Sequence, residues 1–568
     1  MALKVLSALD AAKTQYYHFK AIIIAGMGLF TDSYDLFCIP PIMRMIGRIY
    51  YPKIYRNEYE KDWFEVDRNG NDKYWFEVPK AIASAMIGVA LMGTVVGQLV
   101  FGRLGDRVGR RHVYGVSLMM MVVGALGCGF SLSRLSSMVF VSLGFFRFLL
   151  GIGIGGDYPL SATIMSEFAN KKTRGAFIAG VFSMQGFGIL LSSVITMAVC
   201  SIFKAFADKL TTPLELQPWE NTAPVPPESG LAWRLILMFG AIPAAMTYYW
   251  RMKMPETARF TALVEKNTLQ AAKDMENVLK VSLRSIQEDV EMISTPSSIR
   301  EDVKMISTPD THATLSNTYP FFSREFLRRH GRDLIAASTN WFLIDLVFYP
   351  LNLFQYHAFK GYMTHKSHMN IYDDALQVAK FQALVAISAT IPGYFVTVYM
   401  IDYVGRVKIQ AAGFLLMAVS LFTVAKVNKG GWGSDPGIGF ILLYGLAFFF
   451  SNFGPNTTTF IVPAELFPAR FRATCHGISG AIGKVGAIIG SIGFLWSSRD
   501  SREGVSDTLM AMGGVCVLGF FMTYFFTRET MGRSLEKNEN VDEFTGVWFL
   551  RFWPHKLRAR ETEQTPEN

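Results

Sequence analysis

Long apolar runs alternate with short polar connections along the whole chain. About twelve runs approach or exceed 20 residues, which is the length at which an α-helix crosses a hydrocarbon core of roughly 30 Å. We expect two groups of six spans, at 21–47, 81–102, 112–131, 138–165, 174–200 and 232–250, and then at 334–354, 378–401, 407–426, 437–463, 474–497 and 508–527. The pattern predicts an all-α membrane protein with twelve transmembrane helices.

Polar segments divide these spans into two halves. Residues 1–250 would form the first six-helix half, with a long outer loop at 49–80, and residues 334–527 the second. Between them, 251–333 is rich in charge, Ser, Thr and Pro and is predicted to be a cytoplasmic linker. Residues 528–568 would form a cytoplasmic tail. The hydroxyl groups of linker and tail make both candidate sites for kinases or trafficking partners.

Composition and charge exclude several classes of protein. With 51% hydrophobic and 14% aromatic residues and a positive mean hydropathy, the chain is too apolar for a soluble protein of this size. The net charge of +9 comes from Lys and Arg in short connections, which argues against a nucleic-acid-binding face. Basic connections alternate with less basic ones, so the positive-inside rule predicts that both termini are cytoplasmic.

The two halves share an internal repeat of charged residues. A DxxGR pattern after the second span recurs after the eighth, and a Glu followed seven positions later by an Arg recurs at a similar offset. The repeated residues are Asp106, Arg110, Glu167 and Arg174 in the first half, and Asp402, Arg406, Glu465 and Arg472 in the second. Two halves in the same orientation indicate a parallel repeat, with a substrate site between them.

The first copy of this repeat belongs to a longer motif, GxLxDRxGRR at 102–111. It matches the loop between helices 2 and 3 of the major facilitator superfamily. Its Asp and Arg residues are predicted to clamp a helix N-terminus and neighbouring carboxylates across the halves, as a conformational latch. The alternative is a charge cluster that only sets the membrane topology.

Glycines at 151, 153 and 156 match the dinucleotide fingerprint GxGxxG. That fingerprint requires a preceding strand and a βαβ unit, whereas these glycines lie within a predicted span. Small residues there permit close contact between helices. We therefore expect helix packing and no nucleotide.

Charged residues within the fourth span are functional candidates. Charged groups at membrane depth usually face a cavity and mark a substrate or proton pathway. Asp157, which precedes Tyr158, is predicted to bind and release a proton because a low dielectric disfavours the charged form of a carboxylate. The alternative is a structural ion pair with Arg147.

The first span carries two carboxylates, Asp32 and Asp35, three positions apart and hence on one helix face. Since neighbouring carboxylates disfavour joint ionisation, one should hold a proton. We expect a place in the proton path for both. The alternative for Asp32 is a tie between helices.

Polar and aromatic residues in the second half add candidate ligands. Trp341, Asp345 and Tyr349 lie at i, i+4 and i+8, on one stripe of the seventh span. Amides can donate hydrogen bonds to an anion, and a cation at membrane depth can attract one. These residues are Gln185 in the fifth span, Asn456 in the tenth and Lys484 in the eleventh.

Nearly the full length of the chain resembles the plant and fungal phosphate:proton symporters of the major facilitator superfamily. The likeness is carried by GMGLFTDSYDLFC (26–38), FFRFLLGIGIGG (145–156), GGDYPLSATIMSEFANKKTRGAFIA (155–179), the long run at 448–480 and RETMGRSLE (528–536). The resemblance implies phosphate import at a membrane, with the plasma membrane as the expected location. The sequence differs from the family at Pro350-Leu351, where many members have a pair of polar residues.

The resemblance also implies roles for individual residues. Asp345 would be the protonatable substrate contact, Asp35 and Asp157 the carboxylates of the proton path, and Arg147 the partner of Asp157. The remaining phosphate contacts would be Tyr158, Gln185, Trp341, Tyr349, Asn456 and Lys484.

Aspartates mixed with neutral donors suit a partly protonated oxyanion, whose hydroxyls can donate to a carboxylate. Sulfate lacks such a hydroxyl, whereas arsenate has one and should be accepted. Uptake against a negative inside potential costs roughly 2.3 kcal/mol per charge per 100 mV, so more than one proton should accompany each anion.

Alternatives are a sugar or organic anion as the substrate, or a nutrient receptor. No nucleophile–base or metal constellation appears, so we expect no enzyme, and no cofactor other than the proton gradient.

Overall fold

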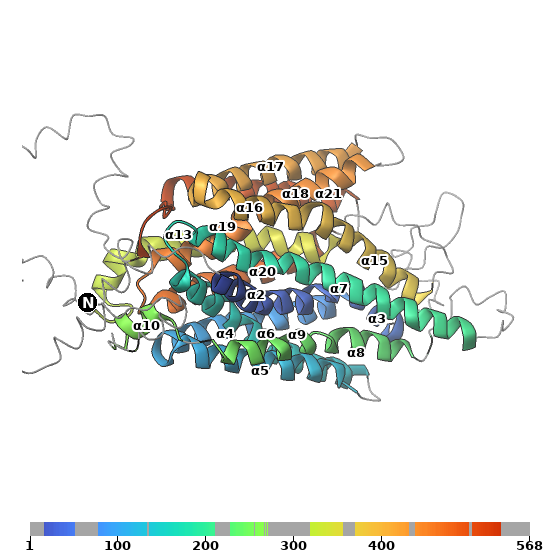
Figure 1. Ribbon diagram of the computed structural model, residues 1–568. Helices are drawn as coiled ribbons and strands as arrows, with labels where there is room; N and C mark the ends of the chain where they lie inside the picture. Colours follow the sequence, from blue (N-terminus) through green and yellow to red (C-terminus); the bar gives the residue numbers. More distant parts are fainter. Residues whose placement is uncertain are drawn as a thin grey trace, which may run out of the picture.

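The structure is a computed structural model, and it is a bundle of long helices that lie side by side (Figure 1). It describes residues 16–51, 78–132, 136–210, 226, 228–254, 256–265, 267, 270, 319–355, 370–430, 438–498 and 502–535. Every regular element within those ranges is helical. The expectation of an all-α fold is confirmed.

The first half contains six spans. Two of them consist of consecutive helices, since α2 is followed by α3 and α8 by α9. The elements are α2 (Tyr16–Phe37), α3 (Ile39–Tyr50), α4 (Lys80–Val108), α5 (Arg110–Gly129), α6 (Ser136–Phe168), α7 (Arg174–Leu210), α8 (Ser229–Met238) and α9 (Ala241–Met252). A short helix, α10 (Ala258–Leu263), follows the sixth span.

The second half also contains six spans, of which the eighth and tenth are divided. Its elements are α13 (Arg324–Leu353), α15 (Ile371–Val385), a π-helical segment η3 (Ala386–Thr390), α16 (Ile391–Val404), α17 (Arg406–Gly430), α18 (Ile438–Phe453), α19 (Pro455–Leu466), α20 (Arg472–Ser497) and α21 (Arg502–Phe526). In Figure 1, α4, α5, α8 and α9 lie along one edge and α17, α18 and α21 along the other.

Eleven helices or helix pairs in the described ranges are long and apolar enough to cross a membrane. The predicted tenth span corresponds to α18 and α19, which meet at Gly454 and are not among these eleven. The predicted spans are therefore all present. Three of their boundaries differ by seven residues or more, since α7 ends at Leu210 rather than residue 200, α13 begins at Arg324 rather than residue 334, and the eighth span begins at Ile371 rather than residue 378.

Threonine hydroxyls stabilise the break at Gly454. Thr397 Oγ1 of α16 donates to the Asn452 and Phe453 carbonyls at 3.0 and 2.7 Å, and Thr457 Oγ1 donates to the Asn452 carbonyl at 2.6 Å. Backbone groups that a broken helix releases at membrane depth need such partners. The tenth span is thus interrupted at a defined point, next to Asn456.

Glycines of α6 let neighbouring helices approach at backbone distance. A Cβ on Gly151 would lie 2.1 Å from the carbonyl oxygen of Ala90 in α4, and one on Gly153 would lie 2.8 Å from that of Ser117 in α5. No side chain fits in those positions. The glycine run is therefore a packing surface, as the sequence predicted.

The outer surface of the bundle is apolar. Large hydrophobic side chains such as Val141, Ile335, Leu442 and Phe145 are well exposed, which is costly in water and suits a lipid environment. With eleven apolar spans of sufficient length, the chain is an integral multi-pass membrane protein.

Two matching turns define one end of the bundle, where α4 and α16 end. Gly109 and Gly405 adopt φ of +110° and +101°, a region that side chains other than glycine rarely occupy. We call the end with these turns and α10 the latch end. The opposite end, where α3 ends and α15 begins, is the far end (Figure 1).

Candidate functional site

A buried ion pair lies between the seventh and eleventh spans. Lys484 Nζ of α20 is 2.8 Å from Asp345 Oδ2 of α13, and both side chains are almost fully buried. Removing two charges from water is costly unless they pair closely. Each of the two charges is therefore stabilised by the other, within the second half.

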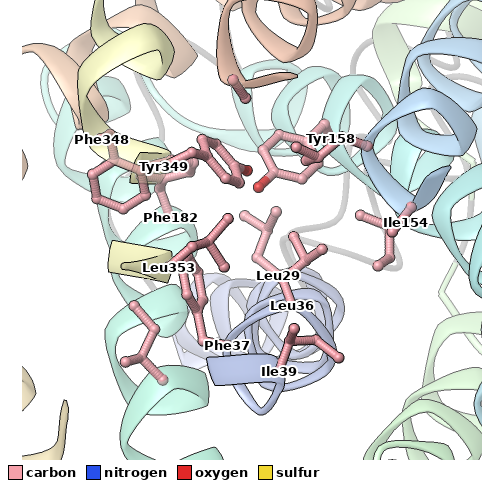
Figure 2. Packing of buried hydrophobic residues seen from close by; sticks show 14 of the residues in the cluster. Leu29, Leu36, Phe37, Ile39, Ile154, Tyr158, Phe182, Phe348, Tyr349 and Leu353 are labelled. Atoms are coloured by element: carbon pink, nitrogen blue, oxygen red, sulfur yellow. The ribbon is translucent and has the colours of Figure 1, made fainter. Parts of the chain in front are cut away.

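Aromatic rings surround this lysine. Lys484 Nζ lies 4.8 Å from the ring centroids of Tyr158 and Tyr349 and 5.9 Å from that of Trp341, within cation–π range. The hydroxyl groups of Tyr158, from the first half, and Tyr349, from the second, face one another (Figure 2). We call Tyr158, Trp341, Asp345, Tyr349 and Lys484 the lysine cluster.

A second polar group, the amide cluster, joins three helices. The Tyr394 hydroxyl of α16 donates to Gln185 Oε1 of α7 at 2.6 Å, and Asn456 Nδ2 of α19 donates to the Tyr394 hydroxyl at 2.9 Å. Asn456 Nδ2 also donates to Asn452 Oδ1 at 2.8 Å. Gln185 belongs to the first half and the other members to the second, so the cluster crosses between the halves.

Phe460 and Phe182 connect the two clusters. Phe460 lies 6.2 Å from Tyr158 and 6.4 Å from Trp341, between ring centroids, and 4.6 Å from Phe182. Phe182 in turn meets the ring of Tyr394 at 5.9 Å. The structure thus brings all seven predicted phosphate contacts into one buried region between the halves.

Three carboxylates of the first half form an acid row. Asp32 lies within electrostatic reach of Asp157, Asp35 and Lys484, so it connects the row to the lysine cluster. None of the six carboxylate oxygens has a hydrogen-bond partner among the described residues. A tie between helices through Asp32 is therefore not observed there.

Two glycines leave space for this row. A Cβ on Gly28 would lie 2.3 Å from Asp157 Oδ1, and one on Gly240 would lie 1.9 Å from Asp35 Oδ1. Gly240 stands at the junction of α8 and α9. These carboxylates can thus approach the neighbouring helices closely because the two glycines have no side chain.

Two arginines act electrostatically on the acid row. Arg147 is fully buried and acts electrostatically on Asp35, whereas the cation that acts on Asp157 is Arg251. The guanidinium of Arg251 also stacks over the ring of Tyr114, 3.3 Å from its centroid. No hydrogen bond joins Arg147 to Asp157 among the described residues, and α9 brings a second arginine, Arg251, within electrostatic reach of that carboxylate.

At the latch end, the first DxxGR copy contacts the second half. Asp106 accepts hydrogen bonds from the Ala473 and Thr474 N–H groups at 3.2 and 2.7 Å, at the N-terminus of α20. A carboxylate at a helix N-terminus is favoured by the unpaired N–H groups and the helix dipole. Arg110 donates to the Ala469 carbonyl at 2.7 Å.

The second copy repeats this contact in the other direction. Asp402 accepts from the Gly175 and Ala176 N–H groups at 3.1 and 2.8 Å, at the N-terminus of α7. Arg406 pairs with Glu465 at 2.9 Å and with Asp402 at 2.9 Å. Each half thus places one carboxylate on a helix N-terminus of the other.

The remaining predicted latch residues join this network. Glu167 pairs with Arg472 of the second half at 2.9 Å and with Arg110 at 3.2 Å. Arg174 donates to the Arg533 carbonyl at 3.0 Å. All eight predicted latch residues therefore lie at the same end of the bundle, in a network whose contacts at Asp106, Glu167 and Asp402 cross between the halves.

The repeated Glu-Thr pairs after the sixth and twelfth spans support these turns. Glu256 accepts from the Arg111 N–H at 3.1 Å, and Glu529 accepts from the Arg406 N–H at 3.1 Å. Thr257 donates to Glu167, and Thr530 donates to Glu465. Burial raises the pKa of Glu256, although two backbone N–H groups favour its charged form.

Ion pairs also join the halves at the far end. Arg44 of α3 lies 3.0 Å from Asp374 of α15, and Arg48 lies 3.5 Å from the same carboxylate. Lys204 of α7 lies 2.7 Å from Asp373. The clusters therefore lie between two closed ends.

Sequence reasoning missed two residues of this region, Tyr394 and Arg251. Tyr394 is one aromatic residue in an apolar span, a pattern that usually means packing. Arg251 is the first residue of the predicted cytoplasmic linker, 251–333, where a basic residue indicates no site. Only the proximity of Gln185 and Asp157, respectively, distinguishes them.

Comparison with known proteins identifies the family. The model of the "Sugar (and other) transporter" family matches residues 21–541. The chain is 56% identical over 552 residues to "Probable inorganic phosphate transporter 1-9" of Arabidopsis thaliana, covering 95% of this chain and 96% of that protein. This chain belongs to the inorganic phosphate transporter family of the major facilitator superfamily. The "Low affinity inorganic phosphate transporter 3" of Petunia hybrida is 46% identical over 562 residues, covering 96% of this chain and 97% of that protein.

Solved structures of the superfamily share the fold of this phosphate transporter family member. The proton:xylose symporter XylE, bound to 6-bromo-6-deoxy-D-glucose, matches with a TM-score of 0.65 and 17% identity, covering 92% of this chain and 98% of that one. The inward-open XylE from E. coli matches with a TM-score of 0.57 and the same identity, covering 92% of this chain and 99% of that one. Membership of a transporter family also confirms that the chain is not an enzyme.

Proposed function

We propose that this protein imports inorganic phosphate together with protons by alternating access, and that arsenate is accepted as a mimic. The observation that carries the proposal is the Asp345–Lys484 pair, ringed by Tyr158, Trp341 and Tyr349. The lysine attracts an oxyanion, and the aspartate accepts a hydrogen bond from its hydroxyl. A sugar site has no need of a buried cation.

The acid row supplies places for protons. Asp32, Asp35 and Asp157 are buried without hydrogen-bond partners among the described residues, which favours their neutral, protonated forms. Asp32 lies within electrostatic reach of Lys484. A negative charge arriving at Lys484 therefore acts on the row, and this is the basis we infer for coupling protons to the anion.

We infer that the latch residues take part in alternating access, by opening and closing one end of the bundle. Its contacts and the far-end ion pairs join the halves at opposite ends. One set of contacts, the latch or the far-end ion pairs, would break while the other stays intact. We infer that the latch end faces the cytoplasm and that the protein lies in the plasma membrane. Both termini are then cytoplasmic.

The experiment that tests this proposal is uptake of radiolabelled phosphate by purified protein in liposomes, with an acid or alkaline outside. Wild type is expected to accumulate phosphate only with the acid outside, and unlabelled arsenate but not sulfate should compete. Asp345→Asn is expected to lose uptake at both pH values. Asp507→Asn, which changes an exposed carboxylate 69% accessible at its side chain, is the matched control.

Other outcomes identify the alternatives. Inhibition by a sugar or an organic anion, with no phosphate uptake, would indicate a different substrate on the same scaffold. Binding of phosphate without any uptake by wild type would favour a nutrient receptor. Equal uptake by wild type and Asp345→Asn would remove Asp345 from the mechanism.

A further inference from the structure

Tyr394 occupies the centre of the amide cluster, and the proposed phosphate chemistry leaves it without a role. Its hydroxyl donates to Gln185 Oε1 at 2.6 Å and accepts from Asn456 Nδ2 at 2.9 Å. The side chain is 1% exposed, and its ring meets Phe182 edge-on at 5.9 Å. Both bonding capacities of a tyrosine hydroxyl are thus used on two residues expected to contact the anion.

We propose that Tyr394 is a positioning residue that orients the amides of Gln185 and Asn456 for a tetrahedral oxyanion. This inference rests on the proposed phosphate function and adds a residue to it. Tyr394 acts through the two amides, and no direct contact with the anion is required.

Hydrogen-bond chemistry explains why orientation matters. An amide has a donor end and an acceptor end, and an oxyanion needs the donor end. Because the Tyr394 hydroxyl occupies the oxygen of Gln185, the Gln185 Nε2 group is left to donate elsewhere. Without this bond the Gln185 oxygen keeps only the longer contact with Asn456 Nδ2 at 3.5 Å, so the amide can rotate and present its oxygen, which repels an anion.

The bond to Asn456 makes the same hydroxyl sensitive to binding. Asn456 Nδ2 donates to Tyr394 and to Asn452 Oδ1 in the closed structure. An anion that takes a hydrogen bond from Asn456 therefore competes with Tyr394 for it. Tyr394 is also bonded to Gln185 of the other half. Replacing the Asn456–Tyr394 hydrogen bond by one from Asn456 to the anion would therefore affect contacts in both halves.

The neighbourhood of Tyr394 is firmly held. Thr397, one turn further along α16, bonds the released carbonyls of Asn452 and Phe453 at the break in the tenth span. A Cβ on Gly393 would lie 2.5 Å from the Phe449 carbonyl oxygen. The hydroxyl of Tyr394 is thus presented from a backbone with little freedom to move.

The test is the concentration dependence of phosphate uptake for Tyr394→Phe, which removes the hydroxyl and keeps the ring. The control is Tyr444→Phe, because the Tyr444 hydroxyl is equally buried but donates to the Leu351 carbonyl at 3.0 Å, away from the amides. Tyr394→Phe is expected to raise the KM for phosphate about tenfold, as expected for losing about one well-made hydrogen bond. Its maximal rate should stay within about twofold of wild type.

A double-mutant cycle separates positioning from general destabilisation. In a Gln185→Leu background, Tyr394→Phe should change KM by clearly less than in the wild-type background, because one of the two amides through which it acts is gone. Tyr444→Phe should keep the wild-type KM in either background. If Tyr394→Phe does not fold, Gln185→Glu takes its place, since Glu still accepts from Tyr394 but has no NH₂ to donate. Its KM should rise at least as much.

Each outcome is decisive. A KM for Tyr394→Phe equal to that of Tyr444→Phe, a full effect of Tyr394→Phe in the Gln185→Leu background, or an unchanged KM for Gln185→Glu would overturn the inference and leave phosphate transport intact. Absence of phosphate uptake by wild type in the same liposomes would overturn the proposed function, and this inference with it.

Discussion

The two halves carry buried carboxylates of opposite character. In the first half, Asp32, Asp35 and Asp157 have no hydrogen-bond partner among the described residues. In the second, Asp345 is bonded to Lys484 at 2.8 Å. Burial is similar in all four cases. The difference lies in whether a cation is supplied within bonding distance.

This contrast separates two tasks. A buried carboxylate without a partner is costly when charged, so it favours a proton. A carboxylate bonded to a lysine can remain charged and leaves a site where an anion can meet both groups. The first half is thus suited to holding protons and the interface to holding the anion, with Asp32 within electrostatic reach of both.

The largest expected effect comes from breaking the pair with Lys484→Met. Asp345 would then be buried without its cation, and removing one partner of such a pair costs about 3–5 kcal/mol. We expect a lower unfolding temperature in detergent and a loss of phosphate uptake of about 100-fold or more, since each 1.4 kcal/mol is a factor of ten.

A second substitution sharpens this prediction. Lys484→Met combined with Asp345→Leu should recover the unfolding temperature but not the uptake, because no uncompensated charge remains while the anion site is gone. Lys429→Met, at an exposed pair with Asp507, is the control. If the double variant recovered both the unfolding temperature and phosphate uptake, the Asp345–Lys484 pair would have a structural role only.

The next effect is expected from Asp157→Asn in the acid row. Asn has the same shape and no hydrogen bond is lost among the described residues, so the unfolding temperature should change little, with the lost attraction to Arg251 as the main cost. Uptake driven by an acid outside should fall about tenfold or more, an effect of about 1.4 kcal/mol. Exchange of labelled for unlabelled phosphate without a gradient should persist. Unchanged gradient-driven uptake would remove Asp157 from the proton path.

A smaller effect is expected from Gly28→Ala, which tests whether the acid row depends on close packing. The added Cβ would lie 2.3 Å from Asp157 Oδ1, and overpacking of this kind costs about 1–3 kcal/mol. Gly88→Ala in α4 has no neighbour within 4 Å and is the matched control. Thermal unfolding of the two variants should differ, with Gly28→Ala the less stable. Equal stability would mean that Asp157 has room to move.

The smallest effect is expected from Lys204→Gln at the far end. This pair also crosses the halves, but its side chains are 36% and 35% exposed. Exposed pairs contribute less than about 1 kcal/mol and are screened by salt. The unfolding temperature should therefore fall slightly at low salt and match wild type at high salt. A large fall in unfolding temperature at both low and high salt would show that this exposed pair contributes as much stability as the buried pairs.

Several features were predictable because they are local. The length of each apolar run specifies a membrane span, and the seven-residue spacing of Glu167 and Arg174 recurs in the second half at Glu465 and Arg472. The stripe of Trp341, Asp345 and Tyr349 follows from the helix period alone. In the structure all three members of the stripe belong to the lysine cluster.

Pairing between distant residues was not predictable in the same way. Lys484 and Asp345 are 139 positions apart, and Tyr394 and Gln185 are 209 apart. The sequence could not show that Arg251 acts on Asp157, because Arg147 and Arg251 both lie in or near spans. Which arginine arrives depends on the rotation and depth of a helix, and neither is encoded within that helix.

The sequence by itself determined the number of spans, the two repeated halves and the set of charged residues available at membrane depth, since each depends on neighbours along the chain. The tertiary structure decided which carboxylate has a cation, which glycine leaves space for an oxygen, and which hydroxyl joins two amides. Those outcomes depend on distances of a few ångströms between helices from different parts of the chain, and only the packing of the whole bundle determines such distances.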